Sequence, residues 1–485
     1  MRSFTFKMNI INFLENCVEK YPTKTALVDE EQNLTFQQLY QKVQNFSSCI
    51  AFLNKKNVIS LIAENSASFI IAYLGIINSG KTVHLISSEI SEFNLLNQIR
   101  SADSEAIICS NMAKKNLNYT STKIPLFEFS DIKSKSVSDV NNSKVNELAY
   151  LIYTSGTTSE PKGVAISHAM IEFTTKNIVK ELGYSNSDVD VLPLPMHHSF
   201  GLGCFHTSLY VGSTLVLLKN ANNLEHVFES LKKYNATTLA AIPATLTKFL
   251  KFDRNVLENY FADIRLIITN STLIPKNTVQ NFKQILKKGH LATYYGLTEA
   301  SRSTFMIFDK NNGREESVGH AAPEVKIKIV NENNNDAEIG EIWIKGNNVI
   351  KKYWNNSKYD KNIVDDWLQT GDIGYFDKEG YLFLKGRNDD IINIGGEKIT
   401  PYEIEEVVKQ IPGVEDAVAF GINHEIFGQV VKLNVVKSKN SDLDKSKILT
   451  HCMKNLEKFK IPSKIDFVEN IPKTDYGKVK RFMLK

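Results

Sequence analysis

The hydrophobic pattern of the chain changes along its length. From about residue 10 to residue 304, short apolar runs such as Val58–Ile62 and Arg265–Thr269 alternate with longer amphipathic runs such as Phe36–Leu53 and Leu224–Tyr234. Short apolar runs are typical of buried strands, whereas apolar residues spaced three and four apart are typical of helices. Their alternation predicts βα units and largely parallel sheets.

The helical pattern disappears between residues 317 and 386. Runs such as Val325–Val330 and Glu341–Lys345 predict strands joined by Asn, Asp and Gly turns, and therefore a small barrel or sheet. A chain of 485 residues is also longer than a domain with a single hydrophobic core usually is. We therefore predict an α/β protein. Its large N-terminal domain, residues 1–388, has βα-layered sheets and a small β-barrel-like subdomain, and residues 389–485 form a small mobile α+β lid domain.

Composition narrows the possible functions. The hydrophobic content of 42% and charged content of 23% are those of an ordinary globular protein. The net charge is only +4, without a basic stripe interleaved with aromatics, so we expect no nucleic-acid partner. The five cysteines are scattered, which favours reduced thiols over disulfides or a zinc site. We see no signal peptide and no apolar run long enough to span a membrane, and expect a cytoplasmic protein.

Candidate chemistry is concentrated in the stretch Tyr153-Thr-Ser-Gly-Thr-Thr-Ser-Glu-Pro-Lys-Gly-Val164, which lies between two strand-like runs. Gly156 and Gly163 allow a positive φ, so backbone N–H groups can form a cradle for phosphate oxygens, and Lys162 adds a charge. A plain Ser/Thr/Gly surface loop is the alternative. Pro161 and the strand after Lys162 argue against a Walker loop, in which helical N–H groups meet the phosphates.

The stretch resembles the signature of the adenylate-forming superfamily, which includes acyl- and aryl-CoA ligases, luciferases and the adenylation domains of peptide synthetases. The usual form is Thr-Ser-Gly-Thr-Thr-Gly-x-Pro-Lys-Gly-Val, and Ser159 replaces the second Gly of that form. The resemblance implies that ATP or AMP is bound by a run of residues here: Thr154, Ser155, Gly156, Thr157, Thr158 and Lys162.

Further motifs in the family's order extend the resemblance over nearly the whole chain. Tyr294-Tyr-Gly-Leu-Thr-Glu-Ala300 matches Tyr-Gly-x-Thr-Glu. By itself it also fits a strand end followed by an acidic helix N-terminus. The resemblance implies nucleotide contacts for Tyr295, which stacks on adenine, for Gly296, and for Thr298 at the α-phosphate. It also implies Mg²⁺ binding by Glu299, a hard oxygen donor.

A second group of motifs lies near the predicted domain boundary. The Thr-Gly-Asp of the family occurs at Asp372, whose carboxylate can accept hydrogen bonds from both ribose hydroxyls. The resemblance also implies that Arg387 reaches the ribose or phosphate. It further implies that Asp389 is the hinge of the lid, a position that absorbs backbone changes away from the chemistry. A hairpin corner is the alternative for Asp372.

The lid carries two more matches. Pro472-Lys-Thr-Asp-Tyr-Gly-Lys478 fits the family's Pro-Lys-Thr-x-x-Gly-Lys, which implies that Lys478 reaches the carboxylate and the α-phosphate during adenylation. A solvated surface lysine is the alternative. Gly395 and Gly396 lack a Cβ, so a pantetheine arm can pass close to the backbone there, and we assign them to a thiol tunnel.

The acid-binding region is expected at Met196-His-His-Ser-Phe-Gly201. Vicinal histidines alone are weak evidence for a metal. The resemblance implies that His198 lies at the mouth of the acyl pocket, against the reacting carboxylate, and that Gly201 belongs to that pocket. His197 receives no role.

Two departures from the family pattern stand out. Asn270-Ser271-Thr272 replaces the usual Gly-Gly-Ala or Gly-Gly-Glu, so we assign Ser271 a contact with the nucleotide through its backbone and expect a polar pocket wall. The usual Lys-Gly-Tyr-Trp appears as Lys351-Lys-Tyr-Trp354, a change that we expect to be structural only.

The resemblance implies an AMP-forming acid–thiol ligase whose catalytic residues are His198, Thr298, Glu299 and Lys478. A carboxylic acid displaces pyrophosphate from ATP with Mg²⁺, and the acyl group then passes to CoA. The run after Phe200 is apolar, without the Asp that holds an α-amine. The predicted acid is therefore fatty or aromatic and lacks an α-amino group, unless an acidic residue such as Asp188 or Asp190 lines the pocket.

Other functions stay open. A stand-alone acyl-AMP ligase that loads the phosphopantetheine of an acyl or peptidyl carrier protein is the alternative, because the same thiol chemistry serves both acceptors. A luciferase-like oxygenase also fits the histidine motif. A pseudoenzyme that kept only the fold is disfavoured, because Glu299, Asp372 and Lys478 are all present.

Overall fold

The computed structural model describes residues 9–116, 124–132, 146–154, 162–308, 313–394, 397–425, 427–439, 441–474 and 477–484. The chain divides into two compact units. Unit 1 comprises residues 1–326 and 344–368, and unit 2 comprises residues 327–343 and 369–485. This division follows compactness and does not test where a hinge lies, so the boundary at residues 388 and 389 stays a prediction.

One sheet of unit 1 has the strand order β18-β8-β7-β4-β3-β5-β6. The pairs among β7, β4, β3, β5 and β6 are parallel, whereas β7–β8 and β8–β18 are antiparallel. The central strands β3 and β4 are buried along their whole length, as expected where helices cover both faces. The strands are β3 (Val58–Ile62), β4 (Thr82–Ile86), β5 (Ser104–Cys109), β6 (Leu126–Glu128), β7 (Leu148–Thr154), β8 (Lys162–Ser167) and β18 (Tyr353–Trp354).

A second sheet of unit 1 runs in the order β2-β1-β10-β9-β11-β12-β13-β14-β15. Its inner pairs, from β1–β10 to β12–β13, are parallel, so the predicted βα architecture is confirmed. The strands are β1 (Thr25–Val28), β2 (Asn33–Thr35), β9 (Val189–Leu192), β10 (Thr214–Leu217), β11 (Thr238–Ala240), β12 (Leu266–Thr269), β13 (His290–Thr293), β14 (Thr304–Phe308) and β15 (Ser317–Ala321).

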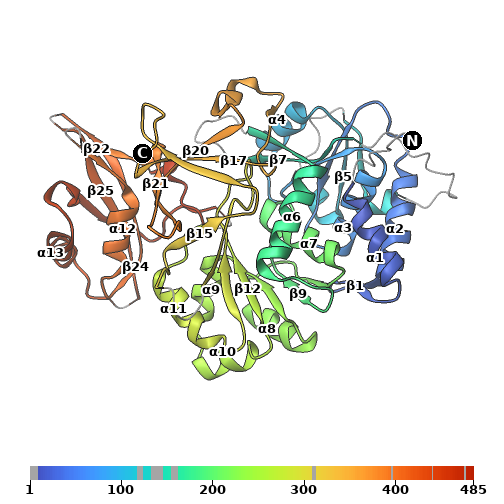
Figure 1. The fold of residues 1–485 in the computed structure, drawn as a ribbon, viewed down its shortest axis with the longest axis horizontal. Coiled ribbons are helices and arrows are strands. Elements are labelled where there is room, and N and C mark those ends of the chain that lie inside the picture. The colour runs from blue at the N-terminus through green and yellow to red at the C-terminus, as the bar shows by residue number, and fades with distance from the viewer. Residues whose placement is uncertain are drawn as a thin grey trace. The chain divides into compact units, whose positions relative to one another are not determined.

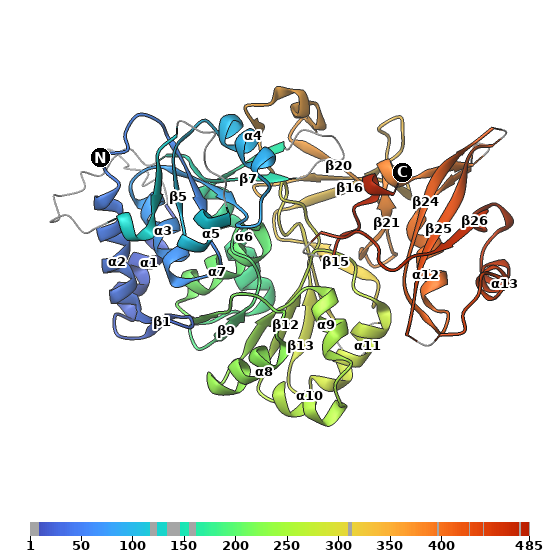
Figure 2. The same cartoon turned by 180° about the vertical axis from the view of Figure 1, so that it is seen from behind.

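Helices cover these sheets. Figure 1 shows α2 and α3 side by side, and Gly75 of α3 lies so close to Phe46 of α2 that a Cβ would come within 2.5 Å of the ring. Helices α8, α10 and α11 gather beside β12 and β13 (Figure 2). The helices are α1 (Ile11–Lys20), α2 (Phe36–Cys49), α3 (Ala67–Asn78), α4 (Glu92–Ala102), α5 (Asn111–Asn116), α6 (His168–Leu182), α7 (Ser199–Val211), α8 (Leu224–Lys233), α9 (Pro243–Phe249), α10 (Arg254–Tyr260) and α11 (Lys276–Ile285).

Helix α7 matters most for the site. Its residues are mostly apolar or small and most of them are buried, so it shows no amphipathic period. It ends at Gly212, whose φ of 77° is the left-handed conformation in which glycine commonly stops a helix. Among the described residues, none of the helices combines the length and apolar content that crossing a membrane requires.

Unit 2 is rich in strands, as the pattern predicted. Strands β16, β17, β20 and β21 are neighbours in that order, and β22 to β26 form a separate sheet. Helices α12 and α13 pack with the latter over a core that includes Ile404, Val431 and Leu433. The elements are β16 (Lys326–Val330), β17 (Ile339–Lys345), β20 (Trp367–Phe376), β21 (Leu382–Arg387), β22 (Ile392–Ile394), β23 (Glu397–Ile399), α12 (Pro401–Lys409), β24 (Val414–His424), β25 (Gly428–Lys437), α13 (Lys445–Asn455) and β26 (Lys464–Phe467).

Candidate active site

The stretch of hydroxyl residues is held by a β-hairpin. Thr154 ends β7, Lys162 begins β8, and the two are antiparallel partners. The Lys162 Nζ lies 4.3 Å from the centroid of the Tyr359 ring. The strands on both sides and the absence of a helix after Lys162 agree with the sequence analysis. The predicted phosphate ligands Ser155, Gly156, Thr157 and Thr158 lie outside the described residues.

A short strand ties this hairpin to the proposed metal ligand. Strand β18 pairs with β8 through Tyr353 opposite Val164 and Trp354 opposite Gly163. The Tyr353 hydroxyl donates a hydrogen bond of 3.1 Å to Oε1 of Glu299. The sequence analysis considered only the change within this motif, which it expected to be structural, and missed Tyr353. The sequence shows the aromatic pair Tyr353-Trp354, but the partner of the Tyr353 hydroxyl is known only once the strands are paired.

Glu299 lies on a tight turn after β13. The turn closes through a pair of hydrogen bonds between Leu297 and Ala300, and a Cβ on Gly296 would lie 2.6 Å from the Ala300 carbonyl oxygen. Tyr295 is buried and donates its N–H to Thr304 Oγ1 at 3.1 Å. The Glu299 carboxylate is half-buried and is a hard oxygen donor, so it fits a Mg²⁺ ligand.

The polar replacement of the family's glycines keeps a glycine-like backbone. Ser271 has a φ of 97°, a conformation that a side chain disfavours. The Asn270 side chain supports the turn by donating to the carbonyl oxygen of Tyr294 at 3.0 Å and by accepting from the Ser271 N–H. The backbone of this segment is therefore positioned against the strand that leads into the Tyr295 turn.

The histidine pair precedes α7. His198 is the residue before the first helical turn, and the rings of His197 and His198 have centroids 4.5 Å apart. Burial lowers the pKa of His197 to about 4, and burial together with His197 lowers the pKa of His198 well below its usual value. Both imidazoles are therefore neutral at neutral pH. A neutral imidazole can hydrogen-bond to a substrate carboxylate but forms no salt bridge with it. The glycine at position 201 has a packing reason, since a Cβ there would lie 2.4 Å from the Pro195 carbonyl oxygen. Its place in an acyl pocket stays a prediction.

The two aspartates considered as pocket carboxylates have other partners. Asp188 forms a two-pronged ion pair with Arg265 at 2.6 and 2.7 Å. Burial alone would raise its pKa, but hydrogen bonds led by that of Arg265 lower it. Asp190 accepts hydrogen bonds from the hydroxyls of Ser208, Ser213 and Thr238, and burial raises its pKa.

Unit 2 brings together the two residues assigned to the ribose. Asp372 and Arg387 face each other across β20 and β21, and the Arg387 Nε lies 2.7 Å from Oδ1 of Asp372. Arg387 also donates to the Thr370 carbonyl oxygen at 3.2 Å. The predicted hinge residue, Asp389, is exposed in a 3-10 turn (Asn388–Asp390) directly after β21.

Lys478 lies in a turn near the C-terminus. Thr474 and Lys478 are joined by two hydrogen bonds, from the Thr474 N–H to the Lys478 carbonyl at 2.8 Å and from the Lys478 N–H to Thr474 Oγ1 at 3.2 Å. The lysine is exposed. The thiol-tunnel glycines 395 and 396 lie outside the described residues. Because Lys478 belongs to unit 2 and Glu299 to unit 1, their joint action on one nucleotide stays a prediction.

Three functional candidates escaped the sequence analysis. They are Tyr353, the buried Arg302, which lies two residues after the Tyr295 motif, and Arg481, which lies three residues after Lys478. An arginine two residues before an apolar strand was a weak sequence signal, since arginine is rarely buried. For Arg481 no local signal exists, because its partners are distant in sequence.

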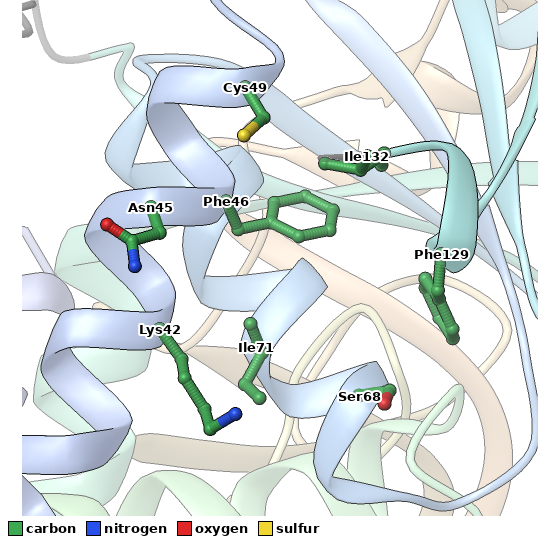
Figure 3. Close-up of a pocket in the computed structure, with 8 residues that line it drawn as sticks. All are labelled: Lys42, Asn45, Phe46, Cys49, Ser68, Ile71, Phe129 and Ile132. Carbon is green, nitrogen blue, oxygen red and sulfur yellow. The ribbon is translucent and has the colours of Figure 1, made fainter. Parts of the chain in front are cut away.

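A cavity of about 220 Å³ lies elsewhere in unit 1, between α2, α3 and residues 129–132 (Figure 3). None of the predicted site residues lines it. Its lining residues are Lys42, Asn45, Phe46, Cys49, Ser68, Ile71, Phe129 and Ile132.

Comparison with known proteins agrees with this site. Residues 14–354 match the model of the AMP-binding enzyme family, and residues 403–478 match the AMP-binding enzyme C-terminal domain. An oxalate–CoA ligase of Arabidopsis thaliana is 30% identical, with 96% of each chain covered. A long-chain-fatty-acid–CoA ligase of Haemophilus influenzae is 26% identical, with 98% of this chain and 94% of that protein covered.

The same similarity extends to solved structures. The o-succinylbenzoate CoA synthetase of Bacillus subtilis, in complex with its acyl-adenylate intermediate, superposes with a TM-score of 0.88 at 25% identity, and 98% of each chain is covered. The fold is therefore that of an adenylate-forming enzyme, with a large N-terminal and a small C-terminal domain. With a family model matching well over half of its length, the chain belongs to the AMP-binding enzyme family, as the sequence motifs predicted.

Proposed function

We propose that this protein is an AMP-forming acid–CoA ligase. It activates a carboxylic acid without an α-amino group as an acyl-adenylate, and then transfers the acyl group to the thiol of CoA. The observation that supports this most is the link within unit 1 between the hairpin of the hydroxyl stretch and Glu299, through Tyr353. A phosphate cradle and a metal ligand fixed to each other are what the first half-reaction needs.

In the first step a carboxylate oxygen bonds to the α-phosphorus of ATP, and the bond to pyrophosphate breaks. A carboxylate is a weak nucleophile, so alignment and stabilisation of charge on the phosphoryl oxygens dominate catalysis. Glu299 would hold Mg²⁺, which when bound offsets that charge. The neutral His198 orients the carboxylate, Thr298 contacts the α-phosphate, and Lys478 donates to the developing charge.

In the second step the lid replaces Lys478 at the acyl-adenylate with the segment that admits the thiol. The lid turns about Asp389, Lys478 withdraws, and the Gly395-Gly396 segment admits the pantetheine arm. The thiol sulfur then bonds to the acyl carbon, the bond to AMP breaks, and AMP leaves with the electron pair. Asp372 and Arg387, already paired in unit 2, hold the ribose through both steps.

The available carboxylates limit which class of acid the pocket can bind. Neither Asp188 nor Asp190 supports an ammonium site, because both are engaged with Arg265 or with hydroxyl groups. The acids in the relatives' names range from oxalate to long-chain fatty acids, so the names do not select one. The relatives are CoA ligases, which favours CoA over a carrier protein as the acceptor.

The test is ATP-dependent release of pyrophosphate across a panel of carboxylic acids, followed by thioester formation with CoA or with a holo-carrier protein. We expect pyrophosphate release that depends on Mg²⁺ and a thioester with CoA. Release with amino acids in preference to their des-amino analogues, or thioester formed only on the carrier protein, would overturn the proposal.

A further inference from the structure

A buried arginine lies against the start of α7. Arg302 is 4% exposed. Its guanidinium donates to the carbonyl oxygens of Ser199 at 3.4 Å and Phe200 at 3.3 Å, and to Ser301 Oγ at 2.7 Å. Its Nε has no hydrogen-bond partner within the described residues. Carbonyl contacts of this length are weak, so these bonds compensate poorly for removing the charge from water.

The groups around the guanidinium are neutral. Arg302 interacts electrostatically with Tyr150, Tyr294, Cys204 and His206. Burial lowers the pKa of His206 to about 3, raises that of Cys204 to about 12, and raises those of both tyrosines above their usual value. At neutral pH none of these four groups carries a charge that offsets the cation. The Tyr294 ring, with its centroid 4.8 Å from the guanidinium carbon, supplies only a cation–π contact.

The neighbouring carboxylates are used elsewhere. Asp190 is bonded to three hydroxyl groups, and Glu299 accepts from Tyr353. In the described part of the chain, no Asp or Glu forms an ion pair with Arg302. Buried arginines are almost always paired, because an uncompensated buried charge costs several kcal/mol. Among the residues that the structure describes, this arginine therefore lacks a counter-charge.

The helix leaves room for this side chain. A Cβ on Gly203 would lie 2.1 Å from the Arg302 Nη2, so any other residue at position 203 would displace the guanidinium. Gly203 is on the same helix as Gly201 and five residues after His198. Arg302 thus lies along the helix that carries the residues assigned to the acid.

We propose that Arg302 binds a second oxyanion on the acid, so that the substrate is in the simplest case a dicarboxylic acid. This inference rests on the proposed function, because it takes His198 as the place of the reacting carboxylate. The Nε–H is unpaired among the described residues and the Nη2 contacts to Ser199 and Phe200 are long, so a carboxylate that replaces those contacts can take Nε and Nη2 of the planar guanidinium in a two-pronged geometry. The guanidinium contacts the carbonyl oxygens of Ser199 and Phe200, which directly follow His198, so a short carbon chain separates the second oxyanion from the reacting carboxylate.

The experiment compares each acid with its own uncharged counterpart. Straight-chain dicarboxylic acids of increasing length are tested beside their half-amides, which keep length and polarity but lose the second charge. The measurement is kcat/KM for pyrophosphate release. We expect the enzyme to prefer one dicarboxylic acid over its half-amide by about a hundredfold or more, because the half-amide leaves the buried cation unpaired.

Two variants separate recognition from folding. In Arg302→Met the preference should fall below about tenfold, since the counter-charge is gone. In Gly203→Ala the arginine is kept but displaced, so the preference should also fall. Arg302→Lys keeps the charge without the planar fork and should retain part of the preference. Urea unfolding of all three reports whether the packing survives.

The outcomes distinguish a failure of the proposed function from a failure of the inference about Arg302. If no acid supports pyrophosphate release, the proposed function is wrong. If the enzyme turns over half-amides or simple monocarboxylic acids as well as the dicarboxylic acids, the ligase assignment stands and this inference is overturned. If Arg302→Met lowers kcat/KM for all acids by the same factor and lowers stability, Arg302 only anchors α7, and the inference is also overturned.

Discussion

Replacing Arg481 by methionine should loosen the C-terminal turn of unit 2. Arg481 lies three residues after Lys478 and makes contacts far away in the sequence. Its Nη2 is 2.7 Å from Oε1 of Glu405 on α12, its Nη1 donates to the Ala419 carbonyl at 2.5 Å, and its Nε is 3.2 Å from Asp390. Methionine has a similar length but removes all of these donors.

The expected loss of stability in Arg481→Met follows from the burial of the ion pair. The side chains of Arg481 and Glu405 are 17% and 6% exposed. Without the arginine, the buried Glu405 carboxylate keeps only the Ala419 N–H, at 2.9 Å, among its hydrogen bonds in the described residues. Breaking a buried ion pair from one side costs about 3–5 kcal/mol. At 1.4 kcal/mol per tenfold, amide exchange of the turn should then be about a hundredfold faster or more.

Hydrogen–deuterium exchange read by mass spectrometry measures this locally, which matters because a two-unit chain need not unfold in one step. The matched control is Lys447→Met, which breaks the exposed pair with Asp442 and should change protection little, because solvent screens that pair. The double variant Arg481→Met/Glu405→Met should recover much of the protection, because no buried charge is left alone.

Adenylation is expected to fall with the turn, because Lys478 depends on it for its position. Protection of residues 477–484 and of α12 that stays at the level of the unchanged protein, or changes no more than in Lys447→Met, would refute the reasoning. The contacts of Arg481 would then be present without contributing to stability.

Four further outcomes are expected. Lys478→Ala should slow adenylation by about 10²–10³ while sparing thioester formation from a pre-made acyl-adenylate; equal losses in both half-reactions would contradict the lid role. Glu299→Gln should raise the Mg²⁺ concentration needed for half-maximal rate, and an unchanged magnesium titration would remove it from the metal site. Ser271→Gly should stabilise the protein by about 1 kcal/mol in urea unfolding, because glycine relieves the positive φ, whereas Ser271→Ala should not. Stability should fall as pH is lowered from about 6.5 toward 4, since burial keeps the pKa of several histidines lower in the folded than in the unfolded chain; flat stability over this range would contradict it. These histidines are His84, His168, His197 and His206.

The sequence by itself determined the architecture and the family. The alternation of short apolar and amphipathic runs predicted the parallel sheets, and elements such as Val58–Ile62 and Leu224–Lys233 lie where the pattern placed them. The periodicity of strands and helices depends on residues that are close in sequence, so a short window of sequence is enough to predict them. The motifs are legible for the same reason, because each is a contiguous run whose members share one turn.

The tertiary structure decided which of these residues act on one another. Tyr353 reaches Glu299 across 54 residues, Arg302 reaches the Phe200 carbonyl across 102, and Arg481 reaches Glu405 across 76. Such contacts depend on how strands pair and helices pack, and no periodicity encodes a single long-range partner. The same holds for burial. In the sequence, Arg302 is an ordinary charged residue. The packing of α7 against it excludes water, and only then does the lack of a counter-charge among the described residues become costly.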